Sequence, residues 1–213
     1  MKKLLMLTLA SSILLLPAAC KRTPSGEALV GRISFIVGDV SLNGHPAAKD
    51  ESVKPGDMIE TKNNSSCEVI VADKNILMVA PDSRMVYNLK SGDGRLELLK
   101  GGFGALLRNK LPFGDFTITT RTVTASIRGT AFYIAAESED KTYACVCNGM
   151  IRFKPGESGT EKTVAASHHK AFYYTRKNGA VVIEEGGLKY HTDASMEKEA
   201  AAIGETIDWN RLE

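Results

Sequence analysis

The chemistry in this sequence centres on two cysteines that alternate along a predicted strand. Cys145 and Cys147 are separated by one residue, and positions i and i+2 of a strand face the same side of a sheet. His168 and His169 follow about one hairpin later, and His191 lies further on. Thiolates and imidazoles are ligands that zinc and copper accept. One hypothesis is therefore a zinc or copper site made by the two cysteines with His168 or His169.

A structural role for the cysteines is the competing hypothesis, in which no cofactor is present. The Cys-x-Cys pattern differs from a Cys-x-x-Cys zinc knuckle and lacks the adjoining histidine of a haem attachment motif. In an oxidising compartment Cys67 could form a disulfide with Cys145 or Cys147. The two neighbours pair poorly with each other, since their Cβ atoms lie about 6–7 Å apart in a strand. Plain buried thiols are the third alternative.

Catalytic motifs are not recognisable in the chain. We find no nucleophile elbow, no Ser/His/Asp order and no paired carboxylates in a convincing context. The peptide Gly92-Asp93-Gly94 has turn chemistry but lacks the lysine and the helix that a phosphate-binding loop needs. We therefore expect a protein that is not an enzyme.

Strands must position the two cysteines. Between residues 119 and 146, apolar residues alternate on both sides of the tripeptide Arg128-Gly129-Thr130. This alternation predicts half-buried strands, and Gly129 between them predicts a bulge or bend. Arg128 is expected to be buried and to donate to carbonyl groups at the strand crossing, with ligand capture as the functional alternative.

Five short motifs, in order over roughly residues 30–155, resemble the FecR domain. They are Val30-Gly31-Arg32-Ile33, Pro55-Gly56-Asp57-Met58-Ile59-Glu60-Thr61, Cys67-Glu68-Val69-Ile70-Val71, Leu96-Glu97-Leu98-Leu99-Lys100-Gly101-Gly102, and Ile118-Thr119-Thr120 leading to Arg128-Gly129-Thr130-Ala131-Phe132. The resemblance implies structural roles for Gly56, Asp57, Thr61, Arg128, Gly129, Thr130 and Phe132. FecR-type signalling proteins place a cytoplasmic segment and a membrane helix before this domain, and neither is expected here.

The N-terminus is typical of an export signal. Lys2 and Lys3 precede an apolar run, residues 4–16, that is too short to span a bilayer. Small residues then lead to Cys20, in the peptide Pro17-Ala18-Ala19-Cys20. We expect residues 1–19 to be a signal peptide.

Cys20 is the expected lipidation site. The peptide before it resembles a bacterial lipobox, although Pro17 occupies the place of the usual leucine. Two or three acyl chains would anchor the protein firmly in a membrane. Lys21 after the cysteine resembles an outer-membrane address, so we expect a lipid-anchored protein facing the periplasm. An ordinary secreted protein with an incidental Cys20 is the alternative.

The mature chain is predicted to be one all-β domain with a short helix at its end. Residues 20–27 form a lipidated polar tether, and residues 28–185 carry many short candidate strands. Turns between them are predicted at Asn43-Gly44, Asn148-Gly149 and Asn178-Gly179, among others. This pattern favours an elongated sandwich or a solenoid-like FecR-type domain.

Residues 186–213 form the predicted C-terminal extension. Thr192-Asp193 supplies helix N-cap chemistry, and Gly204 can end the helix. Met196, Ala200 and Ile203 fall on one helical face, which we expect to dock on the sheet with Trp209 as an anchor. A frayed surface tail is the alternative.

Charge gives no reason to expect nucleic acid as a partner. Without the two lysines of the signal, the chain has 25 basic and 25 acidic residues, interspersed along the sequence. We expect a cell-envelope lipoprotein that acts as a non-catalytic binding or sensing module for an envelope protein or a glycan. The alternative is a metal- or redox-responsive periplasmic module that uses Cys145, Cys147 and the histidines.

Overall fold

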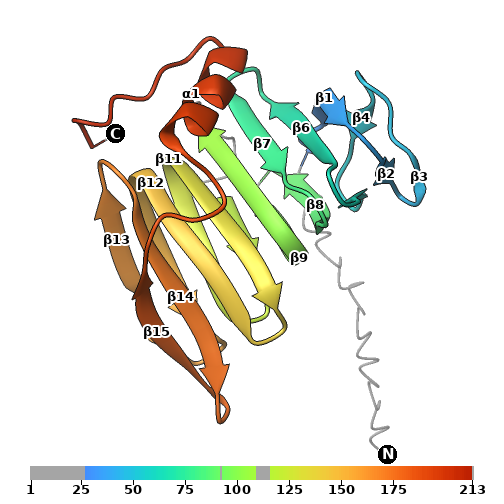
Figure 1. The fold of residues 1–213 in the computed structure, drawn as a ribbon. Coiled ribbons are helices and arrows are strands. Elements are labelled where there is room, and N and C mark those ends of the chain that lie inside the picture. The colour runs from blue at the N-terminus through green and yellow to red at the C-terminus, as the bar shows by residue number, and fades with distance from the viewer. Residues whose placement is uncertain (1–26, 92, 109–115, 213) are drawn as a thin grey trace, which may run out of the picture.

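The computed structural model describes residues 27–91, 93–108 and 116–212 (Figure 1). The predicted signal peptide, the lipidation site Cys20 and nearly all of the tether lie outside these residues. The described part forms one sheet of fifteen strands, followed by one short helix. The predicted all-β class with a C-terminal helix is therefore confirmed.

The strands fall into an N-terminal group of short strands and a central group of long ones. The first group is β1 (Gly31–Val37), β2 (Val40–Leu42), β3 (His45–Pro46), β4 (Ser52–Val53), β5 (Met58–Thr61), β6 (Ser66–Val71), β7 (Asn75–Val79) and β8 (Arg84–Lys90). The central group is β9 (Asp93–Leu107), the short β10 (Phe116–Thr119), β11 (Val123–Ser138) and β12 (Lys141–Pro155). The chain ends with β13 (Lys162–Ala166), β14 (Lys170–Lys177), β15 (Ala180–Gly186) and α1 (Asp193–Ala202).

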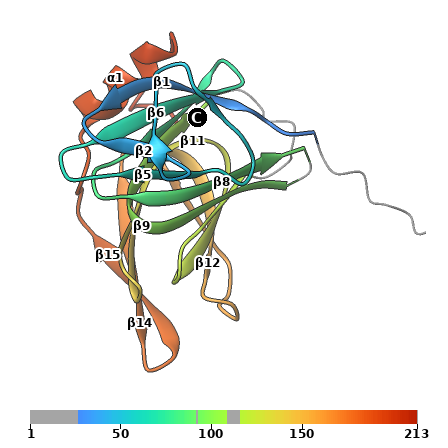
Figure 2. The same cartoon turned by 90° about the vertical axis from the view of Figure 1, so that its right-hand side faces the viewer.

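The long strands change partners along their length. The main path of the sheet is β15-β14-β12-β11-β10-β9-β7-β6-β1-β4, and its pairs are antiparallel except β9 with β10. The first part of β9 pairs with β8 and β10, whereas its second part pairs with β7 and β11. Because of these exchanges the sheet curls over itself around an apolar interior (Figure 2).

A bulge in β11 marks one of these exchanges. Ile127 pairs with Ile151 of β12 and Thr130 pairs with Gly149, so the register shifts at Arg128 and Gly129. Gly129 has a φ of +68°, in the left-handed region that glycine favours. The predicted bulge is thus confirmed. The predicted burial of Arg128 is wrong, because the bulge leaves this side chain exposed.

The predicted turn at Asn148-Gly149 is also wrong. β12 continues through both residues, and Gly149, with a φ of +125°, lies opposite Thr130 beside the β11 bulge. The glycine therefore serves a bend within a long strand pair and not a hairpin. Asn148 is fully buried, and its side-chain amide donates to the carbonyl groups of Ser167 and Asp208 at 3.0 Å.

The N-terminal motif residues make local contacts in the turn that leads into β5. Gly56 has a φ of +101°. The Asp57 carboxylate accepts from the backbone N–H of Lys54 at 2.6 Å and from the Asn43 side-chain amide at 2.8 Å. The Thr61 hydroxyl donates to the Ala80 carbonyl at 2.6 Å. These contacts tie the turn to neighbouring segments.

The later motif residues lie at the β11–β12 crossing. Thr130 is fully buried, and its hydroxyl oxygen lies 3.1 Å from the Met150 carbonyl oxygen, to which it can donate. Phe132 is also fully buried and packs against Phe103 with ring centroids 6.0 Å apart. Both residues therefore stabilise the bent part of the sheet.

Alternate residues of β11 and β12 face two different cores. Before the bulge, β11 is half-buried as predicted. After it, Phe132 and Ile134 face the main core, and Tyr133 faces a second core beneath α1. In β12, Cys145 and Cys147 also face this second core. The helix therefore buries the face of the sheet that carries the two cysteines.

Helix α1 has the predicted caps and docks as expected. Thr192 is the N-cap and accepts from the backbone N–H of Ser195, and Gly204 follows the helix with a φ of +71°. Met196, Ala200 and Ile203 pack into the second core. No helix in the described ranges is long and apolar enough to cross a bilayer.

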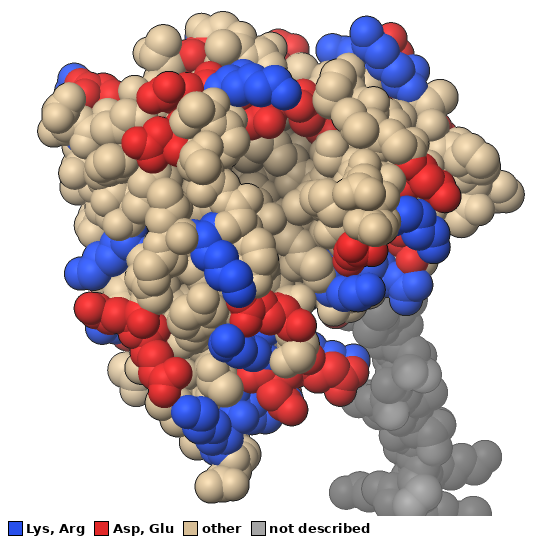
Figure 3. Space-filling view, in the orientation of Figure 1, with Lys and Arg blue, Asp and Glu red and all other residues tan. Residues whose placement is uncertain are grey.

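Charged side chains of both signs are interspersed over the face that carries the extension and the β14–β15 hairpin (Figure 3). Several form exposed pairs, among them Lys177 with Glu184 and Lys74 with Glu205. Such pairs contribute little to stability. This face has no large patch of one sign.

Candidate metal centre

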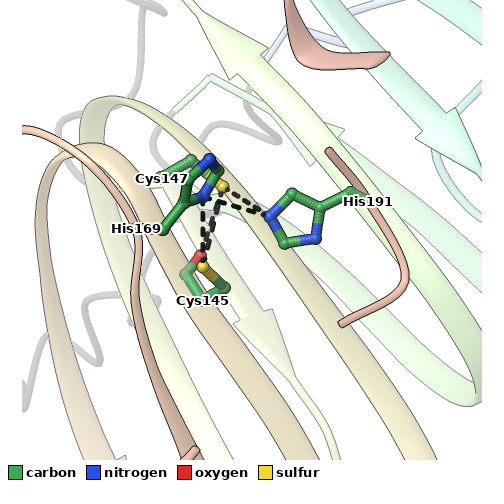
Figure 4. A group of neighbouring side chains, drawn as sticks. All are labelled: Cys145, Cys147, His169 and His191. Carbon is green, nitrogen blue, oxygen red and sulfur yellow. Dashed lines mark hydrogen bonds between the residues drawn. The ribbon is translucent and has the colours of Figure 1, made fainter. Parts of the chain in front are cut away.

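Four side chains from three parts of the chain meet in the second core (Figure 4). Cys145 and Cys147 come from β12, which is paired on both sides by β11 and β14. His169 comes from the turn between β13 and β14, and His191 from the segment between β15 and α1. Both cysteines have no solvent exposure, and His191 is 9% exposed. We call these four residues the Cys2His2 cluster.

The potential ligand atoms of the cluster lie close together. The two sulfurs are 3.9 Å apart, and Nδ1 of His169 lies 3.4 Å from Nε2 of His191. The Cys145 sulfur is 3.6 Å from the His169 nitrogen, and the Cys147 sulfur is 3.2 Å from the His191 nitrogen. All four atoms lie within 4.8 Å of one another.

These spacings are close to those of a tetrahedral metal site. With zinc–sulfur bonds of about 2.3 Å and zinc–nitrogen bonds of about 2.05 Å, the edges of a tetrahedron are about 3.8 Å between sulfurs, about 3.6 Å between sulfur and nitrogen, and about 3.3 Å between nitrogens. Four of the six distances lie within a few tenths of an ångström of these edges, and the other two are no longer than 4.8 Å. The residues present therefore fit a single ion.

The remaining nitrogen of each histidine has its own partner. Nδ1 of His191 lies 2.8 Å from the carbonyl oxygen of Lys189, and Nε2 of His169 lies 2.7 Å from the carboxylate of Asp193. A nitrogen that donates its proton to such an acceptor leaves the other ring nitrogen with a free lone pair. In both histidines that other nitrogen is the one that faces the sulfurs.

The backbone is unusual next to both histidines. His169 has a φ of +36°, and Tyr190, the residue before His191, has a φ of +69°. Residues other than glycine rarely adopt a positive φ, and such residues cluster at functional sites. The backbone N–H of His169 donates to the Cys147 carbonyl at 3.0 Å, which fixes the turn against β12.

Aromatic rings enclose the cluster. Tyr133 stacks on His191 with centroids 5.0 Å apart and an interplanar angle of 11°. Trp209 packs on His168 and His169, with both centroid separations at 5.0 Å. The expected anchoring role of Trp209 is therefore met by contact with these two rings. An apolar, low-dielectric surround strengthens electrostatic attraction between an ion and its ligands.

The structure brings His169 to the two thiols but not His168. His168 is exposed, and its Nε2 lies 3.0 Å from the other carboxylate oxygen of Asp193. His191 takes the fourth position, which our choice of candidate ligands did not include. The sequence did hold one indication of His191: it directly precedes the predicted helix start at Thr192. A helix that docks on the cysteine-bearing face brings its flanking residues close to the cysteines.

Cys67 does not pair with either cysteine of the cluster. It lies on β6 in the main core, and all three cysteines in the described ranges are free thiols. The separation of 3.9 Å between the Cys145 and Cys147 sulfurs is nearly twice a disulfide bond length. The disulfide hypothesis thus finds no support in the structure.

The environment of the cluster shifts the pKa values of the two thiols in opposite directions. The hydrogen bond with Cys147, aided by those with His169 and His191, lowers the pKa of Cys145 to about 3. Burial raises the pKa of Cys147 well above its usual value. Metal binding at this site would release the protons that the ligating groups still carry.

The order of Cys145, His169 and Asp193 also resembles a nucleophile, base and orienting acid. A nucleophile needs room for a substrate, yet Cys145 is fully buried and the other cluster residues occupy the space beside it. A cavity lined by Tyr133 and His191 includes neither cysteine of the cluster in its wall. The geometry therefore favours a closed metal site over a catalytic one.

One family matches part of this chain. The model described as FecR protein matches residues 57–152. This segment of the chain is similar to FecR protein. The matched segment runs from just before β5 into β12 and contains both cysteines of the cluster, but His169 and His191 lie after it. No curated protein matches the sequence.

Solved structures with a similar fold come from Parabacteroides distasonis ATCC 8503. Two crystal structures, at 1.65 and 2.50 Å resolution, are of a protein described as a "putative anti-sigma factor". Each has a TM-score of 0.50 and 14% sequence identity, and the match covers 69% of this chain. The chain spans just under two thirds of those proteins, 65% and 64%. The likeness concerns the fold alone.

Proposed function

We propose that this chain is a non-catalytic, metal-responsive sensing module of FecR type, and that its ligand is one metal ion held by the Cys2His2 cluster. The observation that carries the proposal is the agreement between the four ligand-atom spacings and the edges of a tetrahedral site. The orienting partners of both histidines support it, because metal-binding histidines usually donate their second N–H to an acceptor.

Zinc is the ion that the site fits best. Two thiolates and two imidazoles in a closed tetrahedral arrangement are typical of structural Zn2+. Copper(I) also accepts thiolate ligands and is the alternative ion. Four protein ligands leave no open position for a substrate, so the ion would stabilise a conformation and would not perform chemistry.

The cell envelope is the proposed location of the module. The support is the sequence alone: a predicted signal peptide, then Cys20 as a lipidation site, then a tether. The lipid would hold the domain at the outer membrane facing the periplasm. An envelope protein is the proposed partner, and a glycan is the alternative. The two solved structures with a similar fold are described as a "putative anti-sigma factor", which is compatible with a protein partner in signalling.

Zinc content of the purified full chain tests the metal site. We expect one zinc per chain for the wild type when the protein is prepared under reducing conditions with zinc present. Cys145→Ser should lower zinc affinity about 100-fold or more, because a serine hydroxyl is a far poorer zinc ligand than a thiolate. Cys67→Ser is the matched control, since Cys67 is equally buried but lies outside the cluster.

Equal zinc contents in Cys145→Ser and Cys67→Ser would overturn the proposal. A wild-type protein that binds neither zinc nor copper(I) would do the same. Competition between the two ions for the wild type decides which of them the cluster prefers.

A further inference from the structure

We infer that the metal ion fastens the described part of the C-terminal extension that follows β15, residues 187–212, to the sheet, and that this segment detaches when the ion is removed. The inference rests on the proposed metal site and adds what occupancy of that site does to the fold.

The four ligands come from two separate parts of the fold. Cys145, Cys147 and His169 belong to the β body, where β12 and β14 pair directly with each other. The fourth ligand, His191, belongs to the extension. A metal ion can therefore bind all four ligands only when the extension lies against the sheet.

His169 is the second point of attachment. Three residues of the extension contact it: His191 with a nitrogen–nitrogen distance of 3.4 Å, Asp193 at 2.7 Å, and Trp209 with a centroid separation of 5.0 Å. The extension thus supplies one ligand, the group that orients another ligand, and a ring that covers it. Metal binding and docking of the extension stabilise each other.

The rest of the attachment combines one short helix, a few apolar side chains and several hydrogen bonds, among them those from Asn148 to the Asp208 carbonyl and from Arg108 to the Thr206 carbonyl. Helix α1 has ten residues, fewer than an isolated helix needs for stability in water. The apolar side chains that the extension adds to the second core are Met196, Ala200, Ile203 and Ile207, and Trp209 packs against this core. The ion pair between Lys74 and Glu205 is at the surface and contributes little. Without the ion, the sulfurs and nitrogens of the cluster keep only hydrogen bonds with one another, so the docked state loses the free energy of metal ligation.

Trp209 makes the test direct, because it is the single tryptophan in the sequence and lies over the cluster. Its fluorescence therefore reports on the position of the extension. In the full chain, we expect removal of zinc by a chelator to shift Trp209 emission to longer wavelength. Hydrogen exchange of the α1 amides should become about tenfold faster or more, while the amides of β9 and β11 keep their protection.

Variants separate loss of the ion from loss of packing. His191→Ala should show the detached signals even in excess zinc, and His45→Ala, at an exposed histidine on β3, should behave as wild type. Ile203→Ala changes no ligand. By linkage it should still weaken zinc binding about tenfold or more, because the ion must then drive a less favourable docking.

The outcomes distinguish this inference from the proposed function. If the wild type binds one zinc, but Trp209 emission and α1 exchange are the same with and without it, the inference is wrong and the metal site stands. Unchanged zinc affinity in Ile203→Ala, combined with normal folding, also contradicts the inference. If the wild type binds no metal, both this inference and the proposed function are wrong.

Discussion

The carboxylate of Asp193 accepts a hydrogen bond from Nε2 of His169 at 2.7 Å, and so links the first turn of α1 to a ligand on the far side of the Cys2His2 cluster. Burial by itself would raise the pKa of Asp193, but the hydrogen bonds with His169 and His168 lower it. The carboxylate is thus ionised and is a strong acceptor for the imidazole. This contact favours the His169 tautomer that carries its proton on Nε2, so that Nδ1 offers a lone pair to an ion beside the two sulfurs.

Asp193→Asn should therefore weaken zinc binding without removing a ligand. We expect a loss of about 10–100-fold in affinity, the usual effect of removing an orienting carboxylate from a metal-bound histidine. Competition with a chromophoric zinc chelator measures the change. Asp50→Asn is the control, because Asp50 pairs with Arg32 at the surface. Equal affinities for the two variants would show that Asp193 does not orient the ligand.

Hydrophobic alternation predicted the strands well, since it reflects which face of each strand is buried. It failed where both faces are covered, as in β11 after the bulge, because the covering helix lies more than fifty residues later in the chain. Local turn chemistry misled at Asn148-Gly149: a positive φ serves a bend within a strand as well as a hairpin turn.

The candidate site could be predicted in part. Same-face spacing identified Cys145 and Cys147 as a pair, and adjacency in the hairpin pointed to His169. His191 could not be assigned from spacing, because its position depends on where the extension crosses the sheet. Such long-range placement is set by tertiary packing and leaves no periodic signal in the sequence.

Gly129→Val should destabilise the fold through backbone strain. Gly129 has a φ of +68°, and a Cβ there would meet little, with the nearest atom, the Leu107 carbonyl oxygen, 3.9 Å away. We expect a loss of about 1–3 kcal/mol in the free energy of unfolding, because a β-branched residue resists this conformation. Urea denaturation of wild type and variant measures the difference.

The control for this substitution must have ordinary backbone geometry and free space. Gly159, in the polar loop after β12, fails the second condition. A Cβ there would lie 1.9 Å from the Pro155 carbonyl oxygen. Gly187 meets both conditions, with nothing within 4 Å. Gly187→Val should change stability by no more than about 0.5 kcal/mol. Equal losses at Gly129 and Gly187 would contradict the strain argument.

Cys20 should carry the lipid anchor. We expect metabolic labelling with a fatty acid to mark the wild-type chain and Cys67→Ser, but not Cys20→Ser, because only Cys20 follows a lipobox-like peptide. Cys67→Ser is the matched control for loss of a thiol that is buried in the fold. Equal labelling of Cys20→Ser and wild type would show that Cys20 is not the site of the lipid, and no labelling of either would indicate an ordinary secreted protein.

Glu199, a half-buried residue of α1 that lines the cavity beside the second core, should make stability depend on pH. Burial, followed by the charge of Glu68, raises the pKa of Glu199 to about 7. In the unfolded chain a glutamate has a pKa of about 4.3, so the folded state binds the proton more tightly. Stability is therefore greatest below the unfolded pKa and falls as the pH rises from about 4 to about 7.

Glu199→Gln should remove this loss. We expect the variant to match wild type at pH 4.5 and to exceed it at pH 8 by about 1 kcal/mol, a value reduced for solvent screening of a partly exposed side chain. Urea denaturation at several pH values measures both proteins, and any contribution of the metal is common to the two. Glu139→Gln, at a carboxylate that is 81% exposed, should follow the wild-type profile. Parallel profiles for Glu199→Gln and wild type would show that Glu199 ionises in the folded protein as it does in the unfolded chain.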